Sequence, residues 1–126
     1  MPEAEDRVRA AEEALRASHL LLDNGLWSDA ISRAYYAMVY AARALLATKG
    51  LEPTTHRGTV HLFGREFVRP GTFSVEVAKS LTAAMALRDR ADYGMREDLT
   101  ERDARRTVEA AQEFVAAAKQ ALGRAP

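Results

Sequence analysis

Residues 88–93, with the sequence RDRADY, gather side chains that could bind an anion. The guanidinium of Arg88 can hold a phosphate or a carboxylate through two parallel hydrogen bonds. Asp89 is the next residue, and Asp92 follows Arg88 at the i+4 spacing at which helical side chains pair. Tyr93 adds a phenol at the end of this stretch. The four residues are therefore candidates for a binding site, although the environment of the arginine can be interpreted in two ways.

Arg88 continues the apolar stripe of its own predicted helix. At 100° per residue Val77, Leu81 and Ala84 share one face, and Arg88 follows one turn later. Because an unpaired buried charge is costly, Arg88 should meet a carboxylate or face a cleft. Alternatively, the helix end emerges into water and the arginine extends its charged tip to the surface. The pattern alone leaves both alternatives open.

A second candidate face lies on the segment 28–49. Its apolar stripe is typical core and consists of Ile31, Tyr35, Met38, Ala42 and Leu45. The opposite face carries Arg33, Tyr36, Tyr40 and Arg43. Arginine beside tyrosine suits protein interfaces and stacked or phosphate-bearing ligands, so Arg33 and Tyr36 are further candidates. Alternatively, this helix is central and its tyrosines pack under neighbouring helices.

Glycine and proline divide the chain into five helical stretches. We expect helices over about 4–24, from Ser28 to 49, over 53–68, over 74–91 and from 100 onwards. Ser28, Ser74 and Thr100 are N-cap candidates, the last with Asp103 completing a capping box, and Gly25 is a left-handed helix stop. No strand-like alternation appears. The sequence therefore predicts an all-α fold, an up-and-down bundle of four to five helices in a single domain over 1–126.

The composition excludes several classes of site and location. With 18 basic and 18 acidic residues the chain has no global basic field, although residues 32–96 carry 10 basic and 5 acidic groups, a net +5. The absence of cysteine rules out disulfides and thiolate metal sites. No run reaches the ~18 apolar residues of a membrane span, and the acidic start is unlike a secretory signal. We expect a cytoplasmic protein with no membrane contact, no cofactor and no metal.

The three histidines are weak signals. His56 aligns with Val60, Phe63 and Phe67, which favours a core or capping role. His19 is expected near the inner edge of the first helix, and His61 is expected to be solvated. No Glu-x-x-His pair occurs, which disfavours a di-iron bundle.

The block SRAYYAMVYAARALLATKGLEPTTHRGTVHLFGREFV, followed by LRDRADY and AAQEFV, resembles the HEPN (higher eukaryotes and prokaryotes nucleotide-binding) family. The resemblance spans about residues 10–120 and points to a small stand-alone prokaryotic branch. It implies a helical bundle that is usually a homodimer. Many members pair with a minimal nucleotidyltransferase, often as toxin and antitoxin, and active members are metal-independent ribonucleases.

Active members of this family carry an arginine followed, after four to six residues, by a histidine. Arg88 matches the arginine and Asp89 the adjacent polar position, but Tyr93 stands in place of the histidine and no histidine follows His61. RNA cleavage through the 2′-hydroxyl needs an acid and a base, which histidine supplies near neutrality. A tyrosine phenol, with a reference pKa of about 10, is a poor base.

The resemblance therefore implies an accessory module with weak or no catalysis. It would dimerise and bind a nucleotide, RNA or a nucleotidyltransferase through Arg88, Asp89, Asp92, Tyr93, Arg33 and Tyr36. The alternatives are a metal-independent ribonuclease toxin centred on Arg88 and a purely structural oligomerisation module. In a further hypothesis, a tyrosine hydroxyl accepts a nucleotidyl group from a partner enzyme.

Overall fold

The computed structural model describes residues 2–94 and 96–123. Within these residues five α-helices follow one another: α1 (Pro2–Asp23), α2 (Trp27–Ala47), α3 (His56–Phe63), α4 (Val75–Asp92) and α5 (Glu101–Ala121). A π-helical turn, η1 (Gly64–Val68), extends α3, and a short 3-10 helix, η2 (Arg96–Asp98), precedes α5. No strand occurs among the described residues. The predicted all-α bundle is confirmed.

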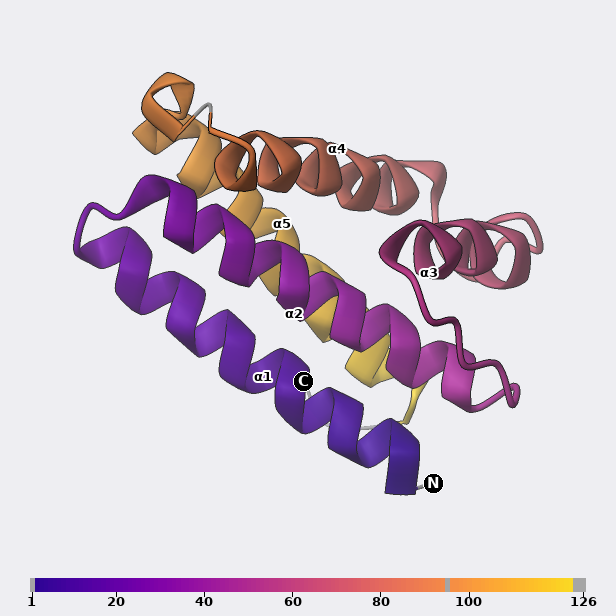
Figure 1. Ribbon diagram of the computed structural model, residues 1–126. Coiled ribbons are helices and arrows are strands. Elements are labelled where there is room, and N and C mark those ends of the chain that lie inside the picture. Colours follow the sequence, from indigo (N-terminus) through magenta and orange to yellow (C-terminus); the bar gives the residue numbers. More distant parts are fainter. Residues whose placement is uncertain (1, 95, 124–126) are drawn as a thin grey trace.

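Helix α2 is the centre of the bundle (Figure 1). It packs against α1, α3, α4 and α5, and its buried residues lie on most of its circumference. Alanines such as Ala30, Ala34 and Ala41 leave room for the neighbouring helices to approach closely. The interpretation of this segment as a central helix is therefore correct, with Tyr35 fully buried and Tyr36 half-buried.

The ends of the helices follow from local hydrogen bonding, as predicted in most cases. The Ser74 side chain accepts from the backbone N–H of Val77, and Thr100 forms a reciprocal capping box with Asp103. Gly25 has a φ of +74° and ends α1. These three assignments agree with the sequence patterns.

The prediction that Ser28 caps α2 is wrong. The helix begins at Trp27, its N-cap is Leu26 without a side-chain cap, and Ser28 is buried in the first turn. The start is fixed by the end of α1, where Gly25 N–H bonds to Leu22 O and Leu26 N–H bonds to Leu21 O. This Schellman arrangement brings the chain directly into the next helix without a polar cap.

A cluster of phenylalanines fixes α3 and η1 on the bundle. The rings of Phe63, Phe67, Phe73 and Phe114 contact one another at centroid distances of 5.2 to 6.5 Å. Because Phe114 belongs to α5, the cluster anchors the end of α3 and thereby sets the position of its first residue, His56. No described helix is both long and apolar enough to cross a membrane.

Candidate functional site

Arg88 lies on the inner face of α4, one turn after the buried Ala84. Only 18% of its side chain is exposed. Its Nη2 donates a 2.8 Å hydrogen bond to the Tyr36 hydroxyl on α2. Two carboxylates of its own helix approach the same guanidinium, with Asp92 Oδ2 at 2.8 Å from Nε and Asp89 Oδ1 at 3.4 Å from Nη1. The arginine therefore continues the inner stripe, as its spacing predicts.

The guanidinium of Arg88 is charged but incompletely satisfied. Its Nε is buried and lies 2.8 Å from Asp92 Oδ2, but this ion pair lacks the geometry of a hydrogen bond. Burial opposes the charge, but the hydrogen bond to Tyr36 and the nearby carboxylates outweigh burial and raise the pKa of Arg88. Since arginine has five N–H donors, this permanent cation retains donors for a ligand.

The ring of Tyr36 joins the candidate residues of α2 and α4. It lies 5.4 Å from the Arg88 Cζ and 4.6 Å from the Arg33 Cζ, both within cation–π range. Ser32 on α2 also donates a 3.3 Å hydrogen bond to Asp92 Oδ1. The two faces that the sequence analysis selected separately are thus one site.

Tyr35 lies beneath this site and is fully buried. Its ring contacts that of Tyr36, with centroids 5.8 Å apart, and its hydroxyl has no hydrogen-bond partner among the described residues. Burial raises the pKa of Tyr35 to about 12, against the opposing charge of Arg88. The phenol therefore keeps its proton at neutral pH.

His56 is a site residue that the sequence analysis missed. Its ring lies 5.4 Å from the ring of Tyr35 and 5.4 Å from that of Tyr36. Burial, and then the charges of Arg88 and Arg43, lower the pKa of His56, so the imidazole is neutral at pH 7. No hydrogen bond joins the ring to any other described residue. The one local signal was Thr55, which caps α3 and places His56 at its start.

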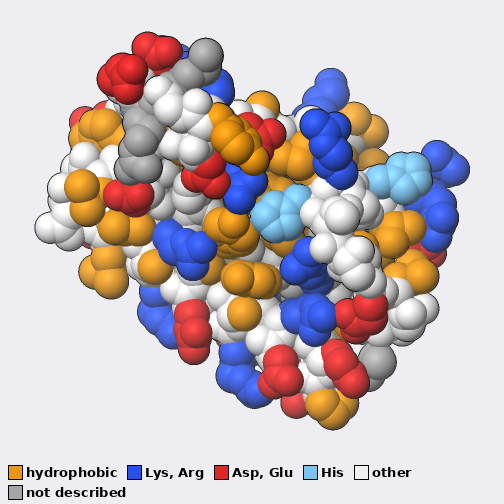
Figure 2. All heavy atoms as spheres, in the orientation of Figure 1, with side chains coloured by type: hydrophobic (Ala, Val, Ile, Leu, Met, Phe, Trp, Pro, Cys, Tyr) orange, Lys and Arg blue, Asp and Glu red, His pale blue; other side chains and the backbone are white. Residues whose placement is uncertain are grey.

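An open pocket of about 400 Å³ is lined by Arg88 and His56, whereas Arg33, Tyr36 and Asp92 do not line it. It lies where the start of α3 packs near the end of α4. Figure 2 shows histidine side chains beside Lys and Arg side chains on this face of the molecule. The lining residues are Thr55, His56, Arg57, Met85, Arg88, Asp89 and Tyr93. Tyr93 is the C-cap of α4 and is 79% exposed at the rim.

One other region, the hollow between α1 and α5, is a weaker candidate. This hollow of about 290 Å³ is lined by Glu12 and Lys119, which neutralise each other at 2.9 Å. His19 lines the same hollow and bonds to Gln112 of α5 at 2.7 Å, so it lies at the edge of α1 that faces α5, and it is exposed there. His61 is exposed, as expected. Within 2–94 and 96–123 no cluster of three or more metal-ligating side chains forms.

Comparison with known proteins identifies the family. A sequence model of the HEPN domain matches residues 4–121. The chain is 39% identical over 115 residues to "Putative toxin MJ0605" of Methanocaldococcus jannaschii, covering 91% of this chain and 85% of the relative. It is 34% identical over 124 residues to a UPF0332 protein of Archaeoglobus fulgidus, covering 98% of each.

A solved structure supports the same fold. The crystal structure of TT1696 from Thermus thermophilus superposes with a TM-score of 0.83, at 16% identity, over 95% of this chain and 98% of that one. At that identity the likeness concerns the fold alone. Together with the sequence matches and the helical bundle, it leads to one conclusion: this chain is a member of the HEPN family.

Proposed function

We propose that this HEPN-family chain is a binding module whose Arg88 pocket takes the phosphate of a nucleotide or of RNA. The observation that carries the proposal is a mostly buried arginine, with free donors, on the wall of an open pocket. Arg57 adds a second cation to the lining, and the ring of His56 offers a surface on which a base can stack.

Asp89 and Asp92 hold Arg88 in the absence of ligand. Their distances of 3.4 and 2.8 Å restrain the guanidinium, while both side chains stay more than a third exposed. An entering phosphate therefore has to compete with solvated carboxylates rather than with a fully buried ion pair. Asp89 also faces the pocket, where it disfavours a second negative charge nearby.

The wider role in this proposal is that of one partner in a toxin–antitoxin-like pair, as a homodimer acting with a minimal nucleotidyltransferase. The toxin name of the Methanocaldococcus relative and the family resemblance support it. Co-purification with a nucleotidyltransferase encoded beside the gene, and the mass of the complex in solution, test this part directly.

The binding proposal is tested by titrating the protein with AMP and with short single-stranded RNA. Arg88→Met removes the charge and keeps much of the volume, and we expect it to weaken binding about a hundredfold. Arg105→Met is the matched control, because Arg105 is an exposed arginine on α5 that pairs with Glu101. Equal losses in both variants, or no binding by the wild type, contradict the proposal.

A second candidate function is metal-independent RNA cleavage, and His56 is the observation that favours it. A neutral imidazole beside Arg88 can accept the 2′-hydroxyl proton while that oxygen attacks the adjacent phosphorus. The 5′-oxygen then leaves and takes a proton from solvent, giving a 2′,3′-cyclic phosphate and a free 5′-hydroxyl. In this route α3 supplies the histidine that is absent from α4.

RNA incubated with the protein in a chelator decides between binding and cleavage. If the second candidate is correct, His56→Ala abolishes cleavage and His61→Ala, on the same helix but exposed, does not. Intact RNA with the wild type favours the pure binding module. If neither nucleotide nor RNA binds or shifts the melting temperature, a purely structural oligomerisation role is favoured instead.

A further inference from the structure

Two buried side-chain polar atoms in the described residues lack a hydrogen-bond partner, and both belong to the Arg88 site. They are the hydroxyl of Tyr35 and the Nε of Arg88, which lies 2.8 Å from Asp92 Oδ2 but without the geometry of a hydrogen bond. The Arg88 Cζ lies 6.0 Å from the centre of the Tyr35 ring, so the two orphaned groups are neighbours. Buried polar groups are nearly always paired, and two exceptions at one point need a physical reason.

Both orphaned atoms are hydrogen-bond donors in the state that the protein holds at neutral pH. An arginine Nε–H can only donate, and the protonated phenol has its O–H available. An anionic oxygen placed between these two neighbouring donors carries enough lone pairs to satisfy both. A cation or an apolar group would leave both donors unpaired.

We propose that one oxygen of the ligand's oxyanion accepts hydrogen bonds from both Tyr35 Oη–H and Arg88 Nε–H. This inference rests on the proposed function and deepens it, because it makes the fully buried Tyr35 a ligand-binding residue. A phosphoryl oxygen is the group of the right chemistry, whether it comes from free phosphate, a nucleotide or an RNA backbone.

The ring of His56 is the pocket residue next to Tyr35. Its centroid lies 5.4 Å from that of the Tyr35 ring, and no hydrogen bond to a described residue fixes its orientation. In this proposal the ring turns aside so that the anion reaches the Tyr35 hydroxyl from the pocket. Once displaced, the imidazole lies beside the bound anion, which favours its protonated form.

The test compares Tyr35→Phe with the wild type for binding of inorganic phosphate, AMP and a short RNA. The substitution removes only the hydroxyl, so we expect the affinity to fall about ten- to a hundredfold. The melting temperature of the free protein should stay the same or rise, because an unpaired buried hydroxyl is lost. Tyr40→Phe, on the same helix, is the control and should change neither quantity.

Unchanged binding counts against the inference, and the pattern of any loss identifies the ligand. Unchanged affinity in Tyr35→Phe overturns it, and a lower melting temperature with unchanged affinity shows that the hydroxyl bonds to an enclosed water instead. Absence of binding by the wild type is a different result, because it removes the proposed function together with this inference. If Tyr35→Phe binds all three probes more weakly, the hydroxyl contacts a phosphoryl group. If it binds only RNA more weakly, the hydroxyl contacts the RNA backbone.

A second measurement needs no Tyr35 variant. In protein labelled with ¹³C at the tyrosine Cζ, the Tyr35 signal is identified by elimination with Phe variants of the other three of the four tyrosines. Titration with phosphate should shift this signal, since its hydroxyl gains an acceptor. A signal that stays fixed while the protein binds phosphate contradicts the proposal.

Discussion

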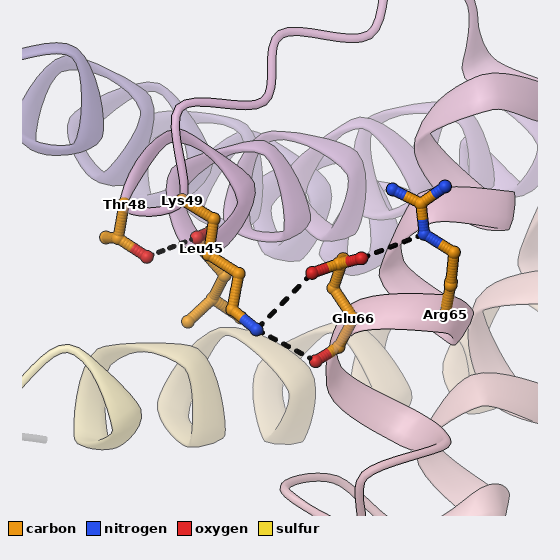
Figure 3. A network of polar contacts seen from close by, with 5 residues as sticks. All are labelled: Leu45, Thr48, Lys49, Arg65 and Glu66. Atoms are coloured by element: carbon orange, nitrogen blue, oxygen red, sulfur yellow. Dashed lines mark hydrogen bonds and ion pairs between the residues drawn. The ribbon is translucent and has the colours of Figure 1, made fainter.

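Two of the arginine–carboxylate clusters among the described residues, one around Glu66 and one around Arg88, differ in almost every respect. Figure 3 shows the first, where the Glu66 carboxylate accepts from Arg65 Nε at 2.8 Å and from Lys49 Nζ at 3.5 Å. Arg65 is 43% exposed, against 18% for Arg88 in the second cluster. The hydrogen bond from Arg65, the largest effect, and the nearby lysine lower the pKa of Glu66.

The comparison shows that paired charges do not by themselves mark a site. In the Lys49–Glu66–Arg65 cluster one carboxylate receives two cations at the surface, where such pairs contribute little to stability. Arg88 is held by a neutral phenol from another helix in addition to Asp89 and Asp92, is mostly buried, and has a buried Nε that makes no hydrogen bond of good geometry. Burial combined with incomplete pairing is what distinguishes a candidate site from a solvated helix end.

The largest difference should appear when each arginine is truncated. Arg88→Ala removes a packed side chain and its hydrogen bond to Tyr36, and we expect a loss of about 2 kcal/mol in the free energy of unfolding. Arg65→Ala should cause no measurable change. Urea denaturation followed by circular dichroism measures both, and equal effects would erase the distinction between the clusters.

A smaller effect on the free energy of unfolding is expected when the hydroxyl that accepts from Arg88 is removed. Tyr36→Phe deletes the hydroxyl that Arg88 Nη2 donates to, and we expect a cost of about 1 kcal/mol. The control is Tyr40→Phe, because the ring of Tyr40 stacks on that of Tyr36 with centroids 6.2 Å apart. It should lower the free energy of unfolding by less. If the two variants are equally stable, the cross-helix hydrogen bond does not contribute to the free energy of unfolding.

The smallest effects are in the pH dependence, where the two clusters act in separate windows. The folded protein lowers the pKa of His56, so the unfolded chain binds the proton more tightly and stability falls as pH drops from about 6.5 through the folded pKa. His56→Ala should remove that part of the slope. Thermal melts over a range of pH measure this. The difference in stability between wild type and variant separates the contribution of His56 from those of the other two histidines.

Glu66 provides the second window. Because the folded protein lowers the pKa of this carboxyl, its contribution is present above the unfolded value and is lost as pH falls below about 4.5. Glu66→Gln should flatten the curve only in that acidic range. A change in the same variant near pH 6 would mean that the two clusters are electrostatically coupled.

Local patterns predicted most of the fold. The i+4 series that ends on Arg88, the Ser74 cap and the Thr100–Asp103 capping box depend on residues within a few positions of one another. Ser28 failed because the start of α2 is set by the Schellman turn that ends α1, which satisfies the backbone without a side-chain cap.

Only part of the candidate site could be predicted, because its remaining contacts join residues that are far apart in the sequence. Arg88, Asp89 and Asp92 lie on one helix, but their meeting with Tyr36 depends on how α4 crosses α2. His56 was assigned to a core stripe with Phe67, although η1 has an i+5 pattern that a 3.6-residue period does not describe. Its contact with Tyr35 follows from the packing of the phenylalanine cluster, which no local pattern reports.

The most direct test of the account is a crystal structure of the protein with AMP. We predict the phosphate in the pocket between α3 and α4, with one oxygen within hydrogen-bonding distance of Arg88 Nε and the ring of His56 turned away from Tyr35. A phosphate bound elsewhere, with Arg88 still held only by Tyr36, Asp89 and Asp92, would contradict the claim that this arginine is buried to receive an anion.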